Sequence, residues 1–378
     1  MNLRDNLLII GEGGFGSKIV QKLIKNGINY DCSVILASDS ERRYIENIEN
    51  DIESLIQLDV DGTGKKPKIA YKRAKAKAKE IDNLVKDYTF ILHLVGFGGG
   101  TGAGTATYIA EKYQRKYHIF SGPMPSFTAG QDIIENSLTN ISNLTQMGRI
   151  WPFDNRKNKD KLFFDKINKE IAKEIGFIDN LLDFNWVARD MDTGNIVDIL
   201  FPEDYKRSGI MSMKRYVIEN MSENISFNKF EEINQSVSFD FSLNSFGTVG
   251  VIYKMADNEN YEDSIEYIQK FDDWLTKKIP GGSFHSGVYN SNDDKSEIIL
   301  LLSGPVLSEE QLKDYIEENS RLVNQFRKNF EEQEEEAFSF KSENKLSFGS
   351  NNATNNDKKK EEHSFFDDDE ESVLDELF

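Results

Sequence analysis

The sequence of 378 residues predicts an α/β protein with three parts: a Rossmann-like domain built on a parallel sheet, a central core helix and a second, smaller α+β domain. Three observations indicate this fold class. The apolar run 88–95 is typical of a strand buried on both faces, and a glycine-rich loop and a helical pattern follow it. Residues 6–26 show the same order of strand, glycines and helix. Apolar side chains recur at helical spacing through 164–184, as expected of a core helix.

The composition indicates an acidic protein. Its 46 Lys and Arg residues against 65 Asp and Glu give a net charge of −19, so nucleic acid or an anionic membrane would need a local basic patch or an adaptor. The single Cys32 excludes an internal disulfide and fits a reducing compartment. One cysteine and four scattered histidines form no zinc motif. No apolar run suggests a membrane span and no signal peptide is evident, so we expect a cytoplasmic protein.

The first glycine-rich loop follows the opening strand 6–10 and contains Gly11, Gly13 and Gly14. Glycines let backbone N–H groups converge, and the helix that begins at 17 adds its positive end, so the loop predicts an anion site. Taken alone it fits dinucleotide-binding folds equally well. Glu12 lies inside this loop, where a carboxylate would repel phosphates unless Mg²⁺ lay between them.

Two further segments are expected at the same edge of the sheet. The strand 32–37 ends at Ser38 and Asp39, and ligands of open α/β sheets bind at such carboxyl ends, although a helix cap is an alternative interpretation. In the loop 61–67, Gly64 permits close approach and Lys65 can neutralise a terminal phosphate. The helix expected over 67–86 is basic on one face. This face is either solvated or a contact for an acidic neighbouring subunit, an anionic polymer or a membrane.

The strongest signal is the loop that follows the strand 88–95. A simple turn that packs a helix near a strand needs one or two glycines, whereas this loop has five within seven residues, and Thr101 adds a hydroxyl. Its members are Gly98, Gly99, Gly100, Thr101, Gly102, Ala103 and Gly104. The loop resembles the tubulin signature, the phosphate loop shared by tubulins, FtsZ, CetZ and TubZ proteins. Supporting matches cover the first half of the chain, and the second half is similar only in its order of elements.

This resemblance implies binding of GTP or GDP with Mg²⁺. Family members place an asparagine after the strand that corresponds to 149–153, which Asn155 matches. They also place an aromatic residue and an asparagine one helical turn apart, which Phe164 and Asn168 match. A ring can stack on a purine and amides can pair with the guanine edge, although Phe164 could instead pack in the core. Two departures remain. Tubulins have a neutral amide where Glu12 stands, and loop 121–130 lacks the glutamate and arginine of FtsZ.

The resemblance also implies hydrolysis between subunits, because in the family an acidic loop of one subunit enters the nucleotide pocket of the next and orients water. The N-x-D-x-x-D pattern of FtsZ is not reproduced. Asp204 is the first candidate, with Glu203 and Asp198 as substitutes, and a helix through Lys214 should follow. Acidic residues near Pro202 also fit a helix cap.

On this basis the chain divides into five parts. They are a GTP-binding domain (1–163), the core helix and acidic loop (164–215), the second α+β domain (216–306), a C-terminal helix (307–337) and a disordered acidic tail with a terminal amphipathic motif (338–378). The motif suggests a short helix for a partner's groove, or the tail is merely solubilising.

The resemblance implies a GTP-binding, GTP-hydrolysing protein that assembles head to tail with itself, with a role in cell shape or cell division. A TubZ-like filament that segregates plasmid or phage DNA through an adaptor is the nearest alternative. Two other classes stay open: a GTP-binding scaffold without hydrolysis, and a dinucleotide oxidoreductase that prefers NAD.

Overall fold

The computed structural model describes residues 3–59, 61–125, 129–155, 161–202, 208–219, 221, 227, 230, 234–257 and 259–305, except for the side chains of residues 131 and 161–164. The helix expected over 307–337 and the tail expected over 338–378 lie outside these residues.

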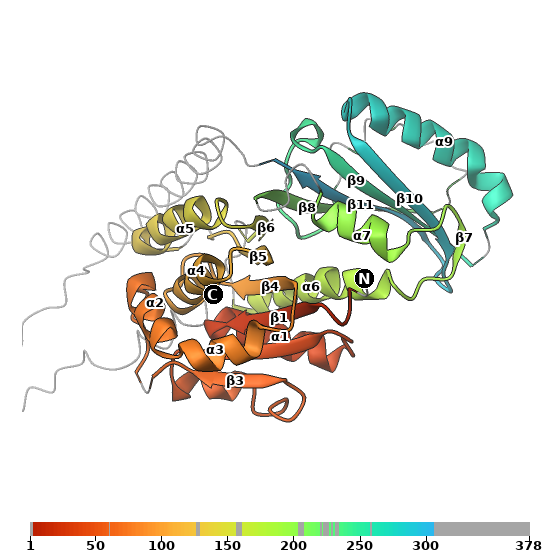
Figure 1. The fold of residues 1–378 in the computed structure, drawn as a ribbon. Helices are drawn as coiled ribbons and strands as arrows, with labels where there is room; N and C mark the ends of the chain where they lie inside the picture. The colour runs from red at the N-terminus through yellow and green to blue at the C-terminus, as the bar shows by residue number, and fades with distance from the viewer. Residues whose placement is uncertain are drawn as a thin grey trace, which may run out of the picture.

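The first half of the chain forms a parallel sheet of six strands in the order β3-β2-β1-β4-β5-β6 (Figure 1). The two central strands, β1 and β4, pair in register from Leu7 opposite Phe90 to Glu12 opposite Val95, and every residue of both is buried. Burial on both faces explains why their sequences are mainly apolar, with Glu12 and His93 as buried polar exceptions. The strands are β1 (Leu7–Glu12), β2 (Asp31–Leu36), β3 (Ser54–Gln57), β4 (Phe90–Val95), β5 (Tyr117–Pro123) and β6 (Arg149–Phe153).

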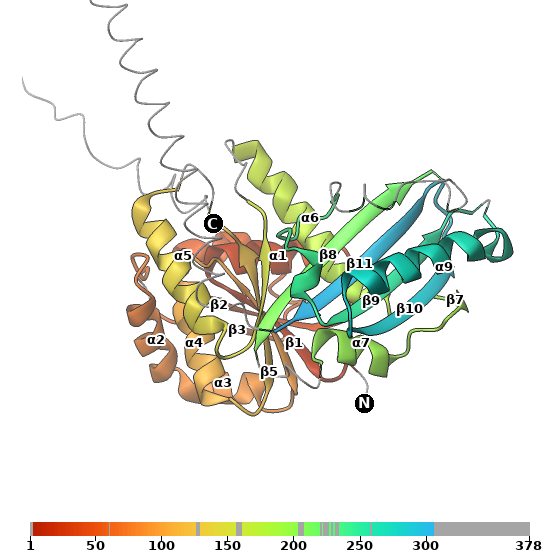
Figure 2. The same ribbon diagram turned by 90° about the horizontal axis from the view of Figure 1, so that it is seen from above.

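Helices cover both faces of this sheet, and Figure 2 shows the two groups on opposite sides of the strands. α1 and α6 pack together over the face that carries Ile9 and Leu92. α2, α3 and α4 cover the other face, where Ile10 and Ile91 point. The helices are α1 (Gly13–Lys25), α2 (Pro67–Ala76), α3 (Ala78–Val85), α4 (Thr101–Lys112), α5 (Gln131–Leu144) and α6 (Lys161–Asn180).

The sheet continues into the second half of the chain through β8, which pairs with β6 at Gly209 and Ile210. Strands β11, β9, β10 and β7 then follow in that order. α7 packs on one face of this mixed sheet and α9 on the other. The elements are β7 (Trp186–Ala188), α7 (Thr193–Leu200), β8 (Gly209–Ile218), β9 (Thr248–Met255), α9 (Tyr261–Lys278), β10 (Ser283–Asn290) and β11 (Ser296–Gly304).

The central helix α6 runs from the carboxyl ends of the parallel strands to their amino ends. Its 20 residues span about 30 Å. The far end is fixed by Arg4, which precedes β1: its Nε donates to Asp179 at 2.9 Å, and its guanidinium also pairs with Asp183 beyond the helix. The loop after α6 therefore lies at the edge of the sheet where the chain begins (Figure 1).

The structure corrects two expected helices. The helix expected through Lys214 is wrong, because 209–218 is the strand β8, held by hydrogen bonds to β11 along its length. Lys214 itself is buried and pairs with Asp240. The expected domain boundary at 215/216 falls inside this strand. The basic helix expected over 67–86 is two helices, α2 and α3, that meet at Lys77.

None of the described helices has the length and the apolar character that a membrane crossing requires.

Candidate functional site

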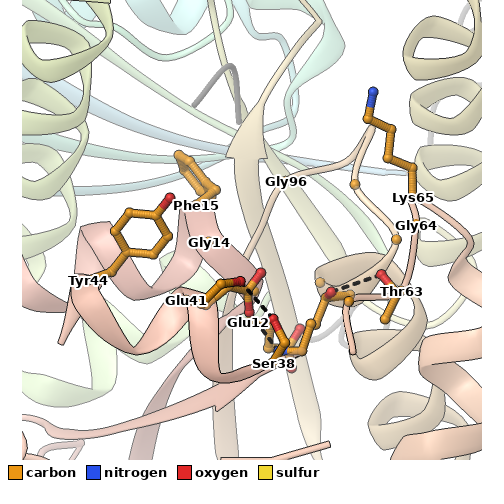
Figure 3. A pocket seen from close by; sticks show the side chains of 18 of the residues that line it. Glu12, Gly14, Phe15, Ser38, Glu41, Tyr44, Thr63, Gly64, Lys65 and Gly96 are labelled. Carbon is orange, nitrogen blue, oxygen red and sulfur yellow. Dashed lines mark hydrogen bonds between the residues drawn. The ribbon is translucent and has the colours of Figure 1, made fainter. Parts of the chain in front are cut away.

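A cavity of about 580 Å³ opens at the carboxyl ends of the parallel strands (Figure 3). Four loops form its wall, and they follow β1, β2, β3 and β4. The lining residues are Glu12, Gly13, Gly14, Phe15, Ala37, Ser38, Ser40, Glu41, Arg43, Tyr44, Gly62, Thr63, Gly64, Lys65, Gly96, Gly98, Gly99, Gly100, Thr101 and Gly102.

The two glycine-rich loops meet in this wall. A Cβ at Gly102 would lie 2.9 Å from the carbonyl oxygen of Glu12, which is too close for any side chain. Gly13 has a φ of +69°, a conformation that L side chains rarely adopt, and a Cβ there would lie 3.1 Å from the Cβ of Thr101. Contact between the loops thus requires glycine on each side. The first turn of α4, which begins at Thr101, supplies unpaired backbone donors at the same place.

The third loop adds a cation to the wall. Gly64 and Lys65 are both in the left-handed region, with φ of 56° and 57°. The loop is held by a 3.1 Å hydrogen bond between the hydroxyls of Thr63 and Thr101, and Asn136 donates to the carbonyl oxygen of Lys65 at 3.1 Å. The Lys65 ammonium lies 3.9 Å from Asp132 and its side chain is about one-third exposed. It can therefore reach a negative group in the cavity.

The loop that follows β2 forms the remaining side of the cavity wall. Glu41 accepts a 2.6 Å hydrogen bond from the backbone N–H of Ala37, and the hydroxyls of Ser38 and Ser40 are 2.9 Å apart. The Tyr44 ring lies close to Gly14, where a Cβ would be 3.4 Å from it, and the Lys18 ammonium lies 4.5 Å from its centre. This wall therefore offers hydroxyls and an aromatic ring.

Glu12 is the buried acidic side chain of the wall, and a chain of hydrogen bonds connects it to two histidines. Its Oε1 lies 2.9 Å from His93 Nδ1, His93 Nε2 lies 3.0 Å from His118 Nδ1, and His118 Nε2 lies 3.1 Å from the carbonyl oxygen of Tyr113. Burial raises the pKa of Glu12 well above its ordinary value and lowers the pKa of His93 to about 3. Burial also lowers the pKa of His118, and His93 and Lys116 add to this effect.

The structure brings most of the predicted site residues together. Eleven line the cavity: Glu12, Gly13, Gly14, Ser38, Gly64, Lys65, Gly98, Gly99, Gly100, Thr101 and Gly102. Gly11 instead packs within β1, where a Cβ would lie 2.6 Å from the carbonyl oxygen of Gly16. Asp39 is exposed at the start of a short 3-10 helix and does not line the cavity.

None of the predicted guanine and catalytic residues whose side chains the structure describes lies in the cavity wall. Asn155 is buried just after β6, and Asn168 is half-buried on α6. The side chain of Phe164 lies outside the described residues. Asp198 is exposed on α7, and Glu203 and Asp204 lie outside the described residues. These assignments remain predictions.

Several lining residues were not predicted from the sequence. Thr63 belongs to the quoted 61–67 loop, and its hydroxyl could have been noted there. Glu41, Arg43 and Tyr44 come from a segment whose sequence reads as a simple helix start, and the sequence contains no signal that they turn toward the cavity.

The arrangement suits a polyphosphate, because backbone donors, hydroxyls and one lysine surround it. Within the described residues, no three His, Cys, Asp or Glu side chains are grouped as a metal site would require. A Mg²⁺ ion there would depend on phosphate oxygens and water for its ligands, which is an ordinary arrangement for this ion.

Comparison with known proteins finds one family in the amino-terminal part of the chain. Residues 6–162 match the model of the Tubulin/FtsZ family, GTPase domain. The chain is 25% identical over 350 residues to the tubulin-like protein CetZ of Pyrococcus abyssi, covering 86% of this chain and 93% of that protein. It is 30% identical over 108 residues to the cell division protein FtsZ of Helicobacter pylori, and this match covers only 28% of either chain.

Solved structures show the same fold. A GTPγS-bound protofilament of CetZ2 from Haloferax volcanii superposes with a TM-score of 0.66 at 14% identity, covering 85% of this chain and 99% of that one. A GTPγS-form protofilament of TubZ from Bacillus thuringiensis serovar israelensis gives a TM-score of 0.66 at 14% identity, covering 88% and 94%. The matched domain, residues 6–162, belongs to the tubulin/FtsZ superfamily, and most of the chain shares the architecture of the solved CetZ and TubZ structures.

Proposed function

We propose that this protein binds GTP and GDP, with Mg²⁺ on the phosphates, in the cavity at the carboxyl ends of β1 to β4. The observation that carries the proposal is the meeting of the two glycine-rich loops, where Gly13 and Gly102 bring the backbones of both into one wall. Lys65 supplies a positive charge to the terminal phosphates. Asn155, Phe164 and Asn168 are proposed for the guanine base, by the resemblance that suggested them.

We further propose that the protein assembles head to tail with itself. The cavity lies at the carboxyl edge of the sheet, whereas the loop between α6 and α7 lies at the opposite edge, about 30 Å away along α6. Stacking the carboxyl edge of one subunit on the amino edge of the next makes a heterologous contact that does not close, which produces an open filament. Solved relatives described as protofilaments support this proposal.

Hydrolysis between subunits needs an acidic side chain at that opposite edge. Asp190 and Asp192 lie in the loop between β7 and α7, and both are exposed. Asp192 caps α7 by accepting the N–H of Asn195 at 2.8 Å, so Asp190 is the freer candidate to orient water. We add Asp190 to Asp198, Glu203 and Asp204 as candidate catalytic residues.

We propose a cytoplasmic role in cell shape or cell division, by likeness to CetZ and FtsZ. Segregation of plasmid or phage DNA is the alternative, and likeness to TubZ supports it. In that case DNA would be bound through an adaptor, because the net charge is −19. The tail over 338–378 is proposed to bind a protein partner.

The test uses the full-length protein. Calorimetry with GTP, GDP and NAD measures nucleotide preference, and negative-stain microscopy with and without GTP detects filaments. Phosphate release is then compared above and below the concentration at which filaments form. A heat of binding with NAD but not with GTP or GDP would overturn the proposed nucleotide. Nucleotide binding without filaments or phosphate release would favour a GTP-binding scaffold without hydrolysis.

Four variants separate the catalytic candidates, and a fifth is their control. Asp190→Ala, Asp198→Ala, Glu203→Ala and Asp204→Ala each remove one candidate carboxylate, and Asp273→Ala removes a matched charge from the exposed face of α9. Loss of a water-orienting group should lower phosphate release by at least about tenfold while filaments still form. If all four candidate variants release phosphate at the same rate as the Asp273→Ala control, the proposed position of the catalytic acid is wrong.

A further inference from the structure

A buried row of side chains leads from the cavity wall across three neighbouring strands. Glu12 ends β1, His93 lies in β4 and His118 lies in β5, and each of the three side chains is at most 2% exposed. The Phe120 ring stacks on His93 with the ring centres 4.8 Å apart, which excludes water from that side. The row ends at the carbonyl oxygen of Tyr113, which can only accept a hydrogen bond.

The hydrogen bonds along the row determine the protonation state of each group. The Tyr113 carbonyl requires a proton on His118 Nε2, so a neutral His118 accepts at Nδ1. His93 must then donate from Nε2 and accept at Nδ1. The remaining link, from Glu12 to His93 Nδ1, needs a proton from Glu12. An ionised Glu12 beside two neutral histidines would leave one of the three links without a proton.

The surroundings favour the neutral carboxyl over an ion pair with His93. Glu12 Oε2 is buried and has no hydrogen-bond partner among the described residues. A buried carboxylate normally needs several donors, and here His93 is the one side chain hydrogen-bonded to it in the described part of the chain. The cavity wall carries Glu41, Arg43 and Lys65 as its other charged side chains. Burial raises the pKa of Glu12 and lowers the pKa of His93, which agrees with the neutral pair.

We propose that Glu12 remains protonated beside the nucleotide, its proton held in place by His93 and His118, so that it presents a neutral carboxyl to the phosphates. The inference rests on the proposed nucleotide site. It explains how an acidic residue can occupy a phosphate loop without Mg²⁺ between them, because a neutral carboxyl does not repel the phosphates. His93 and His118 are positioning residues, since they act through Glu12.

Spectroscopy of the nucleotide-free protein tests the proton directly. Infrared difference spectra between wild type and Glu12→Gln should show the C=O stretch of a protonated carboxyl at about pH 7 and still at about pH 9, since burial opposes ionisation. Nitrogen-15 spectra should show His93 and His118 neutral with the proton on Nε2. His285→Gln is the matched control, because His285 lies outside the row and its loss should leave these signals unchanged.

A carboxylate band for Glu12, or a proton on Nδ1 of His93, would overturn the proposal. Neither measurement depends on nucleotide, so the result is independent of the proposed function. If the carboxyl is protonated but the folded protein binds neither GTP nor GDP, the result supports a protonated Glu12 and contradicts the proposed nucleotide site.

A binding experiment tests the effect on nucleotide. Replacing His118 with Phe keeps an aromatic ring beside Phe120 but removes the last link, so His93 can turn its proton toward Glu12 and stabilise the carboxylate. The affinity of His118→Phe for GDP should fall about tenfold between about pH 7 and about pH 9, because a charge develops next to the phosphates. The wild type should show no such fall.

The double variant completes this test. Adding Glu12→Gln to His118→Phe should remove the pH dependence, because no carboxyl remains to ionise. An equal pH dependence in the single and double variants would overturn the role of Glu12. If His118→Phe does not fold, the spectra of the wild type still decide the proposal.

Discussion

Lys65 occupies a backbone conformation that few side chains adopt. Its φ of 57° follows the φ of 56° at Gly64, so two successive residues are left-handed. A lysine at such a position costs backbone energy that glycine would avoid. Its presence is explained if the ammonium group does something that glycine cannot do, and reaching a terminal phosphate is such a role.

Lys65→Gly therefore separates the charge from the backbone. Glycine adopts the same φ without strain, so the loop should keep its shape while the affinity for GTP falls about tenfold. Calorimetry with GTP and GDP measures the loss, which should be larger for GTP because it has the additional phosphate. Lys68→Ala removes the same charge from an exposed position on α2 and should have little effect. Equal losses in the two variants would show that only overall charge matters.

Whether the role of a single residue could be predicted from the sequence depends on how far along the chain its partners lie. The glycines of each loop lie within a few residues of one another, so the role of each loop could be inferred from local sequence. The protonation state of Glu12 could not be inferred, because it depends on His93, 81 positions away, and on His118, 25 positions further along the chain. Only the pairing of β1 with β4 and of β4 with β5 brings these side chains together.

At the level of elements, two glycines within helices differ in the space around them. In α4, a Cβ at Gly104 would lie 2.2 Å from the carbonyl oxygen of Pro67, so glycine is needed where α2 crosses α4. In α6, a Cβ at Gly176 would have its nearest neighbour, Leu23 Cδ2, 4.0 Å away. The first glycine is required by packing, and the second leaves room for a methyl group.

The same substitution should therefore have opposite effects at these positions. Gly176→Ala should stabilise the protein by about 0.5–1 kcal/mol, because alanine loses less backbone entropy in a helix. Gly104→Ala should destabilise it by about 1–3 kcal/mol, because α2 must shift away. Thermal unfolding of both variants measures the difference. A lower melting temperature for Gly176→Ala, or an unchanged one for Gly104→Ala, would contradict this packing.

Elements with a strong local pattern were predictable from the sequence, and those that depend on pairing were not. The strand at 149–153 was predicted with the bounds it has. The helix expected through Lys214 overlaps the first part of 209–218, yet this segment forms β8 because β6 and β11 lie on its two edges. An isolated bridge between Ser238 and Phe153 likewise depends on pairing between distant parts of the chain.

At the scale of the whole molecule, α6 connects the two edges that would meet in a filament. Its middle is tied to the second half of the chain, because buried Glu174 accepts hydrogen bonds from Val237 N at 2.6 Å and from the Ser238 hydroxyl at 2.7 Å. Trp151 of β6 donates to the same hydroxyl at 2.8 Å. A shift of α6 would have to break these bonds. We therefore expect α6, β6 and the 234–238 segment to move together if nucleotide changes the conformation.

The proposed head-to-tail arrangement makes a prediction about mixtures. A subunit with Lys65→Gly has a cavity that binds GTP weakly, but its acidic loop is intact. A subunit with Asp190→Ala has an intact cavity but lacks the candidate catalytic acid. In a mixed filament of equal parts, about one junction in four joins an intact cavity to an intact loop, because each junction takes its two surfaces from different subunits. At a GTP concentration that fills the intact cavity but leaves the weakened one largely empty, phosphate release from the mixture should therefore approach about a quarter of the wild-type rate, although each variant alone releases little. A mixture no more active than its components would mean that cavity and catalytic acid belong to one subunit. Full-length wild type mixed with Asp273→Ala is the control, and it should show the wild-type rate at every ratio.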